Sequence, residues 1–388
     1  DNVLSVRVDH SRYADSRWYT GSGIYRDVWL IAAPEIRLAQ WGTGWHATSL
    51  TNRQATIAVD MEVQKHIATN DRLELSATLY DAAGKQVAQR RTRVSDGKEG
   101  ITKENLTLKI TNPHRWNLDD PYLYTLKTEL LSNGQRIDGC ETKVGLRTLK
   151  FDPNKGFALN DNWMKVKGVC LHHDAGVLGA VVPPEVWERR LNNLKEIGVN
   201  AIRMSHNPQA PVVYDLCDRL GLLIMDEASD EWEFPKRKWV KGWNKGEPAY
   251  DGSFDFFEEW IEQDVTDMVR RDRNHPSIFM WSIGNEVDYP NDPYSHPILD
   301  GSTINQPMFG GYKPDAPDAM RIGKIAKRLA ACVRAVDTSR PVTGALAGVV
   351  MSNQTEYPEA IDVVGYNYTE NRYDEDLSLI HISEPTRR

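Results

Sequence analysis

Five short apolar runs in the second half of the chain each end in side chains that can exchange protons or hold hydroxyl groups. These side chains are carboxylates, imidazoles, carboxamides, a guanidinium and a phenol. They are His172, His173 and Asp174; Arg203, His206 and Asn207; Asp226 and Glu227; Asn285 and Glu286; and Asn367 and Tyr368. If the runs are parallel strands of one barrel, their carboxyl ends meet at the same rim, where the five groups converge.

Glycoside hydrolysis is the chemistry that this set of side chains suits. One carboxylic acid protonates the leaving oxygen, a second carboxylate acts as nucleophile or base, and neutral groups hold the sugar hydroxyls. The sequence contains no serine nucleophile elbow, no H-E-x-x-H zinc motif and no P-loop. These absences argue against the enzyme classes that are built on those motifs.

Glu286 is the strongest candidate for the acid. It follows apolar strand residues that include Trp281 and Ile283, and it comes directly after Asn285. A general acid needs a pKa raised toward neutrality, which a partly apolar wall such as Trp281 can supply. The alternative, a surface glutamate at a strand end, fits poorly beside Asn285.

The elements that must position these residues follow from an alternation of strand and helix patterns after about Phe151. Apolar runs predict six strands, at residues 166–174, 200–206, 222–228, 277–286, 341–346 and 360–368. Amphipathic segments predict helices at residues 183–199, 211–221, 254–272 and 319–337. Such repeated βα units predict a parallel sheet covered by helices, and six strands favour an incomplete (β/α)8 TIM barrel over an open sheet.

The first part of the chain has strand patterns without a convincing long helix. Residues 39–147 hold several runs of alternating apolar and polar residues, which is typical of a small β-sandwich. Residues 1–38 carry strand signals too, but too few to close a core. We therefore expect them to be the end of a preceding β-domain.

Composition limits the classes of function. The 388 residues include 55 acidic and 47 basic ones, with a net charge of −8, and this balance argues against a nucleic-acid partner. No stretch approaches the roughly 18 apolar residues of a membrane span, so no membrane partner is expected. The four cysteines form no C-x-x-C pair, which argues against a zinc or disulfide scaffold.

The two ends of the sequence carry separate expectations. The chain begins at Asp1 within a strand pattern, so a signal peptide and the compartment, bacterial periplasm or cytoplasm, are left open. Residues 377–388 (LSLIHISEPTRR) look like a translated sequencing adapter, with a short natural tail as the alternative. We therefore expect a fragment that is cut at about Asp376.

Several motifs resemble those of glycoside hydrolase family 2. RDRNHPSIFMWSIGNE (271–286) is similar to the acid/base signature of that family, and NAIRMSHNP (200–208) is similar to its other signature. GSGIYRDVWL (21–30) looks like the end of its jelly-roll domain, and KVGLRTLKF (143–151) looks like the end of its Ig-like domain. The layout is most similar to that of bacterial β-galactosidases, while β-glucuronidases and β-mannosidases share the architecture.

The resemblance implies a multidomain fold of β and α/β parts. Residues 1–38 would be the C-terminal part of a jelly-roll sugar-binding domain, and residues 39–147 an Ig-like β-sandwich. Residues 148–376 would form about six of the eight strands of a TIM-barrel catalytic domain. Residues 377–388 would be a non-native tail.

The resemblance also assigns roles to individual residues. Glu286 corresponds to the general acid/base, and Asn285 to the residue that holds the hydroxyl next to the reacting carbon. Arg203 and His206 match the R-x-S-H pattern of the family. The arginine would steady the carboxylate of the nucleophile and the histidine would contact sugar, although either could instead be structural.

Four further residues are expected to bind substrate. His172 corresponds to a sugar-contacting histidine of the galactosidase branch, although its neighbours differ from the family pattern. Asn207 follows the R-x-S-H pattern, and Tyr368 is a candidate to hydrogen-bond the nucleophile. Asp9 is expected either to reach the same pocket from the jelly roll or to lie in a turn at a strand end.

A metal site is also considered, because some β-galactosidases of the family place Mg2+ beside the acid/base. Glu231 and Glu286 are the candidate ligands here, but the position of the companion histidine of the family is occupied by Glu233, or by Trp232 under a one-residue shift. We predict no cofactor and no required metal. The loop at residues 230–243 is either a Trp-bearing rim for the leaving-group sugar or an ordinary solvated loop.

The expected function is a retaining exo-β-glycosidase that hydrolyses terminal β-D-galactosides by double displacement. Its substrate partner would be a β-linked oligosaccharide or glycoside, and a homo-oligomer is left open. The alternatives are a β-glucuronidase or other β-glycosidase of the same family, or a non-catalytic carbohydrate-binding protein. By resemblance the nucleophile is a glutamate that ends a seventh strand, beyond this chain, so we expect the 388-residue chain to be inactive and poorly soluble.

Overall fold

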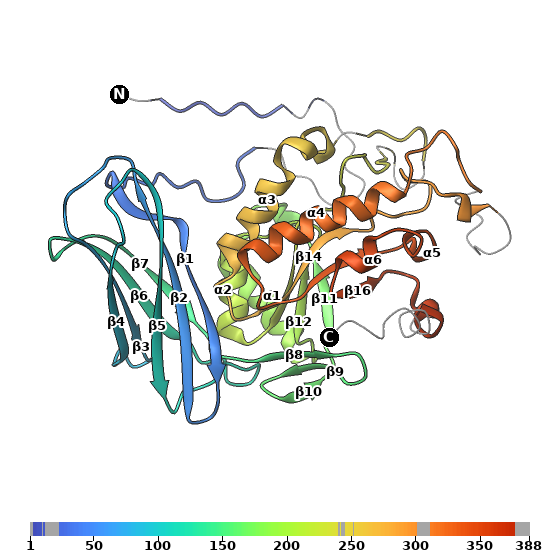
Figure 1. Cartoon of the computed structure of the whole chain (residues 1–388). Helices are drawn as coiled ribbons and strands as arrows, with labels where there is room; N and C mark the ends of the chain where they lie inside the picture. Colours follow the sequence, from blue (N-terminus) through green and yellow to red (C-terminus); the bar gives the residue numbers. More distant parts are fainter. Residues whose placement is uncertain are drawn as a thin grey trace.

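A computed structural model describes residues 3–9, 11, 23–239, 241, 245–250, 252–300 and 311–376 of the chain. An antiparallel β-sandwich lies beside a parallel sheet that is covered by helices, and a small third β-layer lies at one end of that sheet (Figure 1). The adapter-like tail, residues 377–388, lies outside the described residues.

The sandwich contains two antiparallel sheets in the described part of the chain. The strands of one sheet have the order β1-β2-β5 and are Ile36–Leu50, Gln54–Lys65 and Gly100–Thr111. The strands of the other have the order β4-β3-β6-β7 and are Gln86–Arg93, Leu73–Tyr80, Tyr124–Ser132 and Gln135–Val144. Alternate side chains of a strand point to opposite faces, so Leu106, Leu108 and Ile110 of β5 are buried between exposed neighbours. The predicted β-sandwich is confirmed.

The segment before β1 differs from its prediction. Strands were expected within residues 1–38 because of their strand signals. In the structure, residues 3–9, 11 and 23–35 form no strand. A strand persists only where its peptide groups pair with a neighbour. The first such pairing in the described residues is that of Ile36 with Lys65, where β1 begins.

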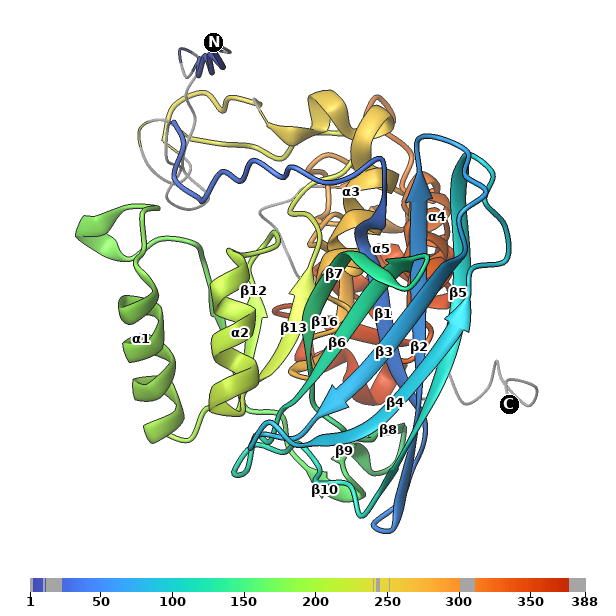
Figure 2. The same ribbon diagram turned by 90° about the vertical axis from the view of Figure 1, so that its left-hand side faces the viewer.

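The second part of the chain forms a parallel sheet whose strand order follows the sequence. Among the described residues its six strands are β11 to β16: Gly168–Leu171, Ala201–Met204, Leu223–Glu227, Ile278–Asn285, Val342–Leu346 and Val363–Tyr366. The helices α1 to α4 follow the first four strands and are Pro184–Glu196, Pro211–Leu220, Phe257–Asp272 and Met320–Val336. This confirms the predicted part of a (β/α)8 barrel, and Figure 2 shows α1 and α2 side by side on its outside.

Shorter elements complete the connections. The helices α5 and α6 lie between β15 and β16 and are Val349–Ser352 and Tyr357–Ala360. Single turns of 3-10 helix lie at Gly176–Leu178, Ser253–Phe256, Pro297–Leu299 and Glu370–Arg372. Among the described residues, none of the helices is long and apolar enough to cross a bilayer.

The ends of the helices follow from residue type. Pro184 and Pro211 are the first residues of α1 and α2, a position where the missing N–H leaves no hydrogen bond unmade. Gly221 ends α2 with a φ of 71°, and a Cβ there would overlap the backbone of Leu118. Glycine is therefore required both for the left-handed turn and for the close approach.

A small antiparallel sheet covers the amino end of the barrel strands. Its strands β8, β9 and β10 are Leu149–Asp152, Gly156–Leu159 and Asn162–Met164. Phe157 packs in one cluster with Ala201 and Leu223, which begin β12 and β13. This layer closes the amino end of the sheet, so a substrate site must lie at the carboxyl end.

The sandwich contacts the barrel beside the start of β14. Arg270 Nη2 of α3 lies 2.5 Å from Glu62 Oε2 of β2. The Asn274 side chain, in the turn before β14, donates to Thr43 O at 2.8 Å. The strand that carries Asn285 is therefore connected to the sandwich at its beginning.

Candidate active site

Glu286 directly follows β14 at the carboxyl end of the parallel sheet. Its backbone has a φ of 49°, and its N–H donates to Ala345 O of β15 at 2.6 Å. The Asn367 side chain, just after β16, donates to Glu286 Oε1 at 2.8 Å. Because Glu286 is only half-buried, its carboxylate is held in place and still partly exposed.

Asn285 is completely buried, and both ends of its carboxamide are hydrogen-bonded. Its Oδ1 accepts a hydrogen bond from Arg203 Nη2 at 2.8 Å, and its Nδ2 donates to Asp230 Oδ1 at 2.8 Å. Asn367 Nδ2 lies 3.4 Å from the same Oδ1. Residues from the ends of four different strands thus meet at Asn285 and its neighbour.

Glu227 is fully buried at the end of β13 and joins several of these residues. Its Oε2 accepts hydrogen bonds from Arg203 Nε at 2.9 Å, Arg203 Nη2 at 2.6 Å and Ser282 Oγ at 2.7 Å. Its Oε1 lies 2.6 Å from His206 Nδ1. Burial favours the neutral acid, but the hydrogen bond with His206 and the charge of Arg203 outweigh it and lower the pKa of Glu227.

Arg203, His206 and His172 form the side of the site next to Glu227. Burial disfavours the guanidinium charge, but the adjacent Glu227 carboxylate outweighs it and raises the pKa of Arg203. The ring of His172 meets that of His206 edge to face, with centres 5.3 Å apart. Burial, together with the nearby His206, lowers the pKa of His172. The structure therefore brings together these three predicted residues with Asn285.

The other predicted residues have different surroundings. Asn207 is half-buried beside His206, and its carbonyl accepts a hydrogen bond from Gln209 at 3.4 Å. Tyr368 is 80% exposed. Asp9 Oδ1 accepts from the backbone N–H and the hydroxyl of Ser11, at 3.0 and 2.6 Å, within its own segment. The roles expected for Asn207, Tyr368 and Asp9 stay predictions.

A different part of the N-terminal segment contacts the barrel rim. The ring of Tyr25 stacks on that of His173, with centres 5.6 Å apart. Arg26 Nη1 donates to Pro208 O at 3.0 Å. The Y-R pair of the GSGIYRDVWL motif thus connects this segment to the residues that follow β11 and β12.

The expected apolar wall beside Glu286 is wrong for Trp281. The indole N–H of Trp281 donates to Asp337 Oδ2 at 2.9 Å, and Asp337 lies before β15 begins. Trp281 is the fourth residue of β14, level with the start of β15, and lies in the core between sheet and helices. A separation of five residues along a strand is about 16 Å, so Trp281 is too far from Glu286 to desolvate it.

Glu231, a candidate metal ligand, and its neighbour Glu233 are bound to cations of the chain itself. Glu231 Oε2 lies 2.7 Å from Lys238 Nζ. Glu233 forms an ion pair with Arg321 and accepts a hydrogen bond from the Tyr294 hydroxyl at 3.0 Å. These residues do not fit a Mg2+ site of the kind expected at Glu231.

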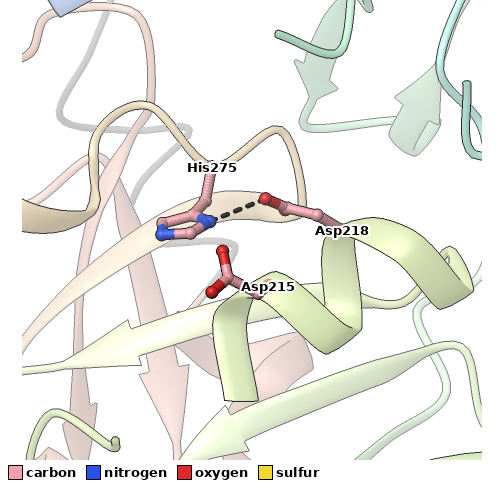
Figure 3. A group of neighbouring side chains, drawn as sticks. All are labelled: Asp215, Asp218 and His275. Carbon is pink, nitrogen blue, oxygen red and sulfur yellow. Dashed lines mark hydrogen bonds and ion pairs between the residues drawn. The ribbon is translucent and has the colours of Figure 1, made fainter. Parts of the chain in front are cut away.

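Among the described residues, the side chains that could offer three ligand atoms to a metal lie elsewhere. They are Asp215, Asp218 and His275, with ligand atoms within 4.8 Å of one another (Figure 3). His275 Nδ1 lies 2.6 Å from Asp218 Oδ2, and Asp218 Oδ1 accepts from Ser277 N at 3.0 Å. Ser277 immediately precedes β14, so this group lies at the opposite end of the strand from Glu286 and holds the start of β14.

Two residues of the site had no assigned role in the sequence. Glu227 and Asn367 were recognised only as polar residues at strand ends, yet they contact Arg203, His206 and Glu286 directly. The available signal for Glu227 was an acidic residue at the end of an apolar strand. Its partners are distant in sequence, so their identity required the fold.

Known proteins show the same architecture and sequence pattern. The model of the TIM barrel domain of glycosyl hydrolases family 2 matches residues 153–378, and a second family 2 model matches residues 43–147. The chain is 39% identical to the β-galactosidase BoGH2A of Bacteroides ovatus, over 95% of this chain and 42% of that protein. It is 30% identical to a β-glucuronidase of Bacteroides fragilis, over 75% of this chain and 42% of that protein. The chain spans less than half the length of these relatives.

A solved structure agrees with the fold. The crystal structure of a glycosyl hydrolase family 2 member from Bacteroides cellulosilyticus matches with a TM-score of 0.79 and 31% identity, over 96% of this chain and 44% of that chain. The barrel model alone covers more than half of the residues, and the other model covers the sandwich before it. The chain therefore belongs to glycosyl hydrolase family 2.

Proposed function

We propose that the protein is a retaining exo-β-glycosidase that hydrolyses terminal β-D-galactosides. The observation that carries the proposal is the position of Glu286 at the carboxyl end of a barrel strand. Beside it, Glu227 fixes Arg203 and His206, and Arg203 in turn binds Asn285. A β-glycosidase of family 2 is the coarser statement that the relatives support.

In this mechanism Glu286 first donates its proton to the oxygen of the leaving group. It then removes a proton from the water that releases the sugar. Asn285 cannot rotate freely, because both ends of its carboxamide are bound, so it can hold a sugar hydroxyl beside Glu286 in one orientation. We place the nucleophile on a further glutamate outside the described residues, which Arg203 would steady through paired hydrogen bonds.

Galactose is proposed as the glycone because the layout is most similar to bacterial β-galactosidases and a relative with that name is 39% identical. A β-glucuronidase is the alternative, since another relative carries that name. A glucuronidase needs a cationic clamp for the sugar carboxylate. These glycones are distinguished by assaying the protein of the complete reading frame with a set of nitrophenyl glycosides. If none of them is hydrolysed, a non-catalytic carbohydrate-binding protein is favoured.

The role of Glu286 is tested by Glu286→Gln. We expect hydrolysis of a natural disaccharide to fall by about a hundredfold to ten-thousandfold, because its leaving group needs a proton. Activated nitrophenyl glycosides should lose far less, since their leaving group departs without protonation. Glu188→Gln, on the outer helix α1, is the control and should leave both rates unchanged; equal losses on both substrates of Glu286→Gln would contradict the acid role.

A further inference from the structure

A buried lysine contacts the peptide group that precedes Glu286. Lys236, in the loop after β13, is 2% exposed. Its Nζ donates to Asn285 O at 2.5 Å and lies 3.1 Å from Asp230 Oδ1. Burying an ammonium group is unfavourable unless its charge and its N–H groups are paired. The loop therefore keeps this lysine at a point where its charge is satisfied by Asn285 and Asp230.

The contact fixes both sides of one peptide bond. The carbonyl of Asn285 accepts from Lys236, and the N–H of the same peptide, on Glu286, donates to Ala345 O at 2.6 Å. The Asp230 carboxylate that pairs with Lys236 also accepts from the side chain of Asn285. Lys236 thus acts on the backbone and the side chain of Asn285, and through them on the direction of Glu286.

A second lysine lies beside Glu231, one of the two candidate Mg2+ ligands. Lys238 Nζ lies 2.7 Å from Glu231 Oε2, and the same oxygen accepts from the backbone N–H of Lys236 at 3.1 Å. On the other side, a Cβ built on Gly252 would overlap the Glu231 carboxylate. The Glu231 side chain is therefore enclosed by the chain itself.

The charges of these four buried or nearly buried side chains balance. Asp230 and Glu231 contribute two negative charges, and Lys236 and Lys238 contribute two positive charges. Divalent cations of the Mg2+ type are bound through the oxygens of carboxylates, carbonyls and water, and the negative charge of the carboxylates balances the charge of the ion. Here the negative charges of Asp230 and Glu231 are already neutralised by the ammonium groups of Lys236 and Lys238.

We propose that Lys236 is a positioning residue for the hydrolysis, and that Lys236 and Lys238 take the place of the Mg2+ that some β-galactosidases of the family hold beside the acid/base. The kinetic part of this inference rests on the proposed function of Glu286. Since these cations belong to the chain, a chelator cannot remove them, and EDTA should leave the rate of hydrolysis unchanged.

The metal part is tested without any activity measurement. The protein of the complete reading frame and its Lys236→Met/Lys238→Met variant are treated with EDTA, desalted and titrated with Mn2+, with free Mn2+ followed by electron paramagnetic resonance. We expect the wild type to bind none at this loop and the variant to gain a Mn2+ site that disappears when Glu231→Gln is added. Stoichiometric binding by the wild type that is lost in Glu231→Gln would overturn the proposal, and so would a folded double variant that binds no Mn2+.

The positioning part is tested by kinetics. Lys236→Met should lower kcat about a hundredfold, as a small misplacement of a catalytic group does, with little change in KM. Lys236→Arg keeps the charge and should retain more of kcat, whereas Lys109→Met removes an exposed lysine of the sandwich strand β5 and should change nothing. A folded Lys236→Met with wild-type kcat would refute the role. If the wild type hydrolyses no glycoside, the proposed function fails, while the Mn2+ titration still decides the role of the lysines.

Discussion

Glu227 shows how one buried charge orders several side chains around Glu286. It binds Arg203 and His206, which come from the end of β12, and Ser282 of β14. Its pKa is lowered in the folded protein. The stabilisation that follows from this shift is therefore present at neutral pH and is lost as the pH falls through the lowered pKa.

Glu227→Gln should damage both the stability and the activity of the protein. The amide leaves the Arg203 guanidinium buried without its counter-ion, which costs about 3–5 kcal/mol, and it frees Arg203 and His206 to move. We expect a lower Tm at neutral pH, a smaller difference in Tm at acidic pH, and a loss of kcat/KM on nitrophenyl glycosides.

A matched control for Glu227→Gln is Glu62→Gln. Glu62 pairs with Arg270 between the sandwich and the barrel, far along the sequence from the site residues. Its replacement should lower Tm while kcat/KM of the folded protein stays unchanged. If Glu227→Gln behaves in the same way as Glu62→Gln, the ordering role of Glu227 is wrong.

The strand β14 is fixed at both ends by charged groups of other elements. At its carboxyl end Lys236 and Arg203 bind Asn285. At its amino end His275 pairs with Asp218 of α2 (Figure 3). Burial alone would lower the pKa of His275, but the Asp218 carboxylate outweighs it and raises the pKa to about 9.

The pair of His275 and Asp218 predicts a pH-dependent stability. Because the folded pKa is raised from 6.5 to about 9, the stabilisation is fully present below pH 6.5 and is lost as the pH rises through 9. A shift of this size corresponds to roughly 3 kcal/mol. His275→Gln should therefore lower the free energy of unfolding by about that amount at pH 6 and by much less at pH 10, as measured by denaturant titration.

His46→Gln provides the comparison for this measurement. His46 lies 3.7 Å from Asp60 at a position where both side chains are nearly half exposed. Such a surface pair contributes little, so the variant should follow the wild type at both pH values. A His275→Gln variant whose deficit is equal at pH 6 and pH 10 would show that the charge of His275 is not what stabilises β14.

At the scale of the whole molecule, the parallel sheet has two edges in the described part of the chain. The outer strands are β11, which pairs only with β12, and β16, which pairs only with β15, among the described residues. All residues of β15 are buried, whereas all residues of β16 are only half-buried. Open edges present unpaired N–H and C=O groups that can pair with another chain.

The 388-residue chain expressed alone should therefore aggregate and show no hydrolase activity. Size-exclusion chromatography and sedimentation measure the soluble fraction, and nitrophenyl β-galactoside reports activity. The protein of the complete reading frame, prepared in the same way, is the comparison. Soluble 388-residue chain that hydrolyses this substrate and loses the activity on Glu286→Ala would contradict the prediction and its placement of the nucleophile.

The sequence by itself determined the order of the elements and the position of the acid/base candidate. Apolar runs and amphipathic periodicity are local properties, so the six barrel strands and the four long helices were predicted at the places where the structure has them. The Asn285-Glu286 pair was recognised because it directly follows the buried strand β14. Strand signals within residues 3–9 and 23–35 misled, since a strand also needs a neighbour with which to pair.

Only the tertiary structure decided which side chains meet. Glu227 contacts Arg203 and His206 across 24 and 21 residues of sequence, and Lys236 reaches Asn285 across 49. The direction of Trp281, toward Asp337 and away from Glu286, likewise depends on the register and face of β14. Pairings of this kind arise from the path of loops and the packing of strands, which local residue patterns do not encode. The contacts of Lys236 with Asn285 and of Lys238 with Glu231 were visible only once those loops were placed.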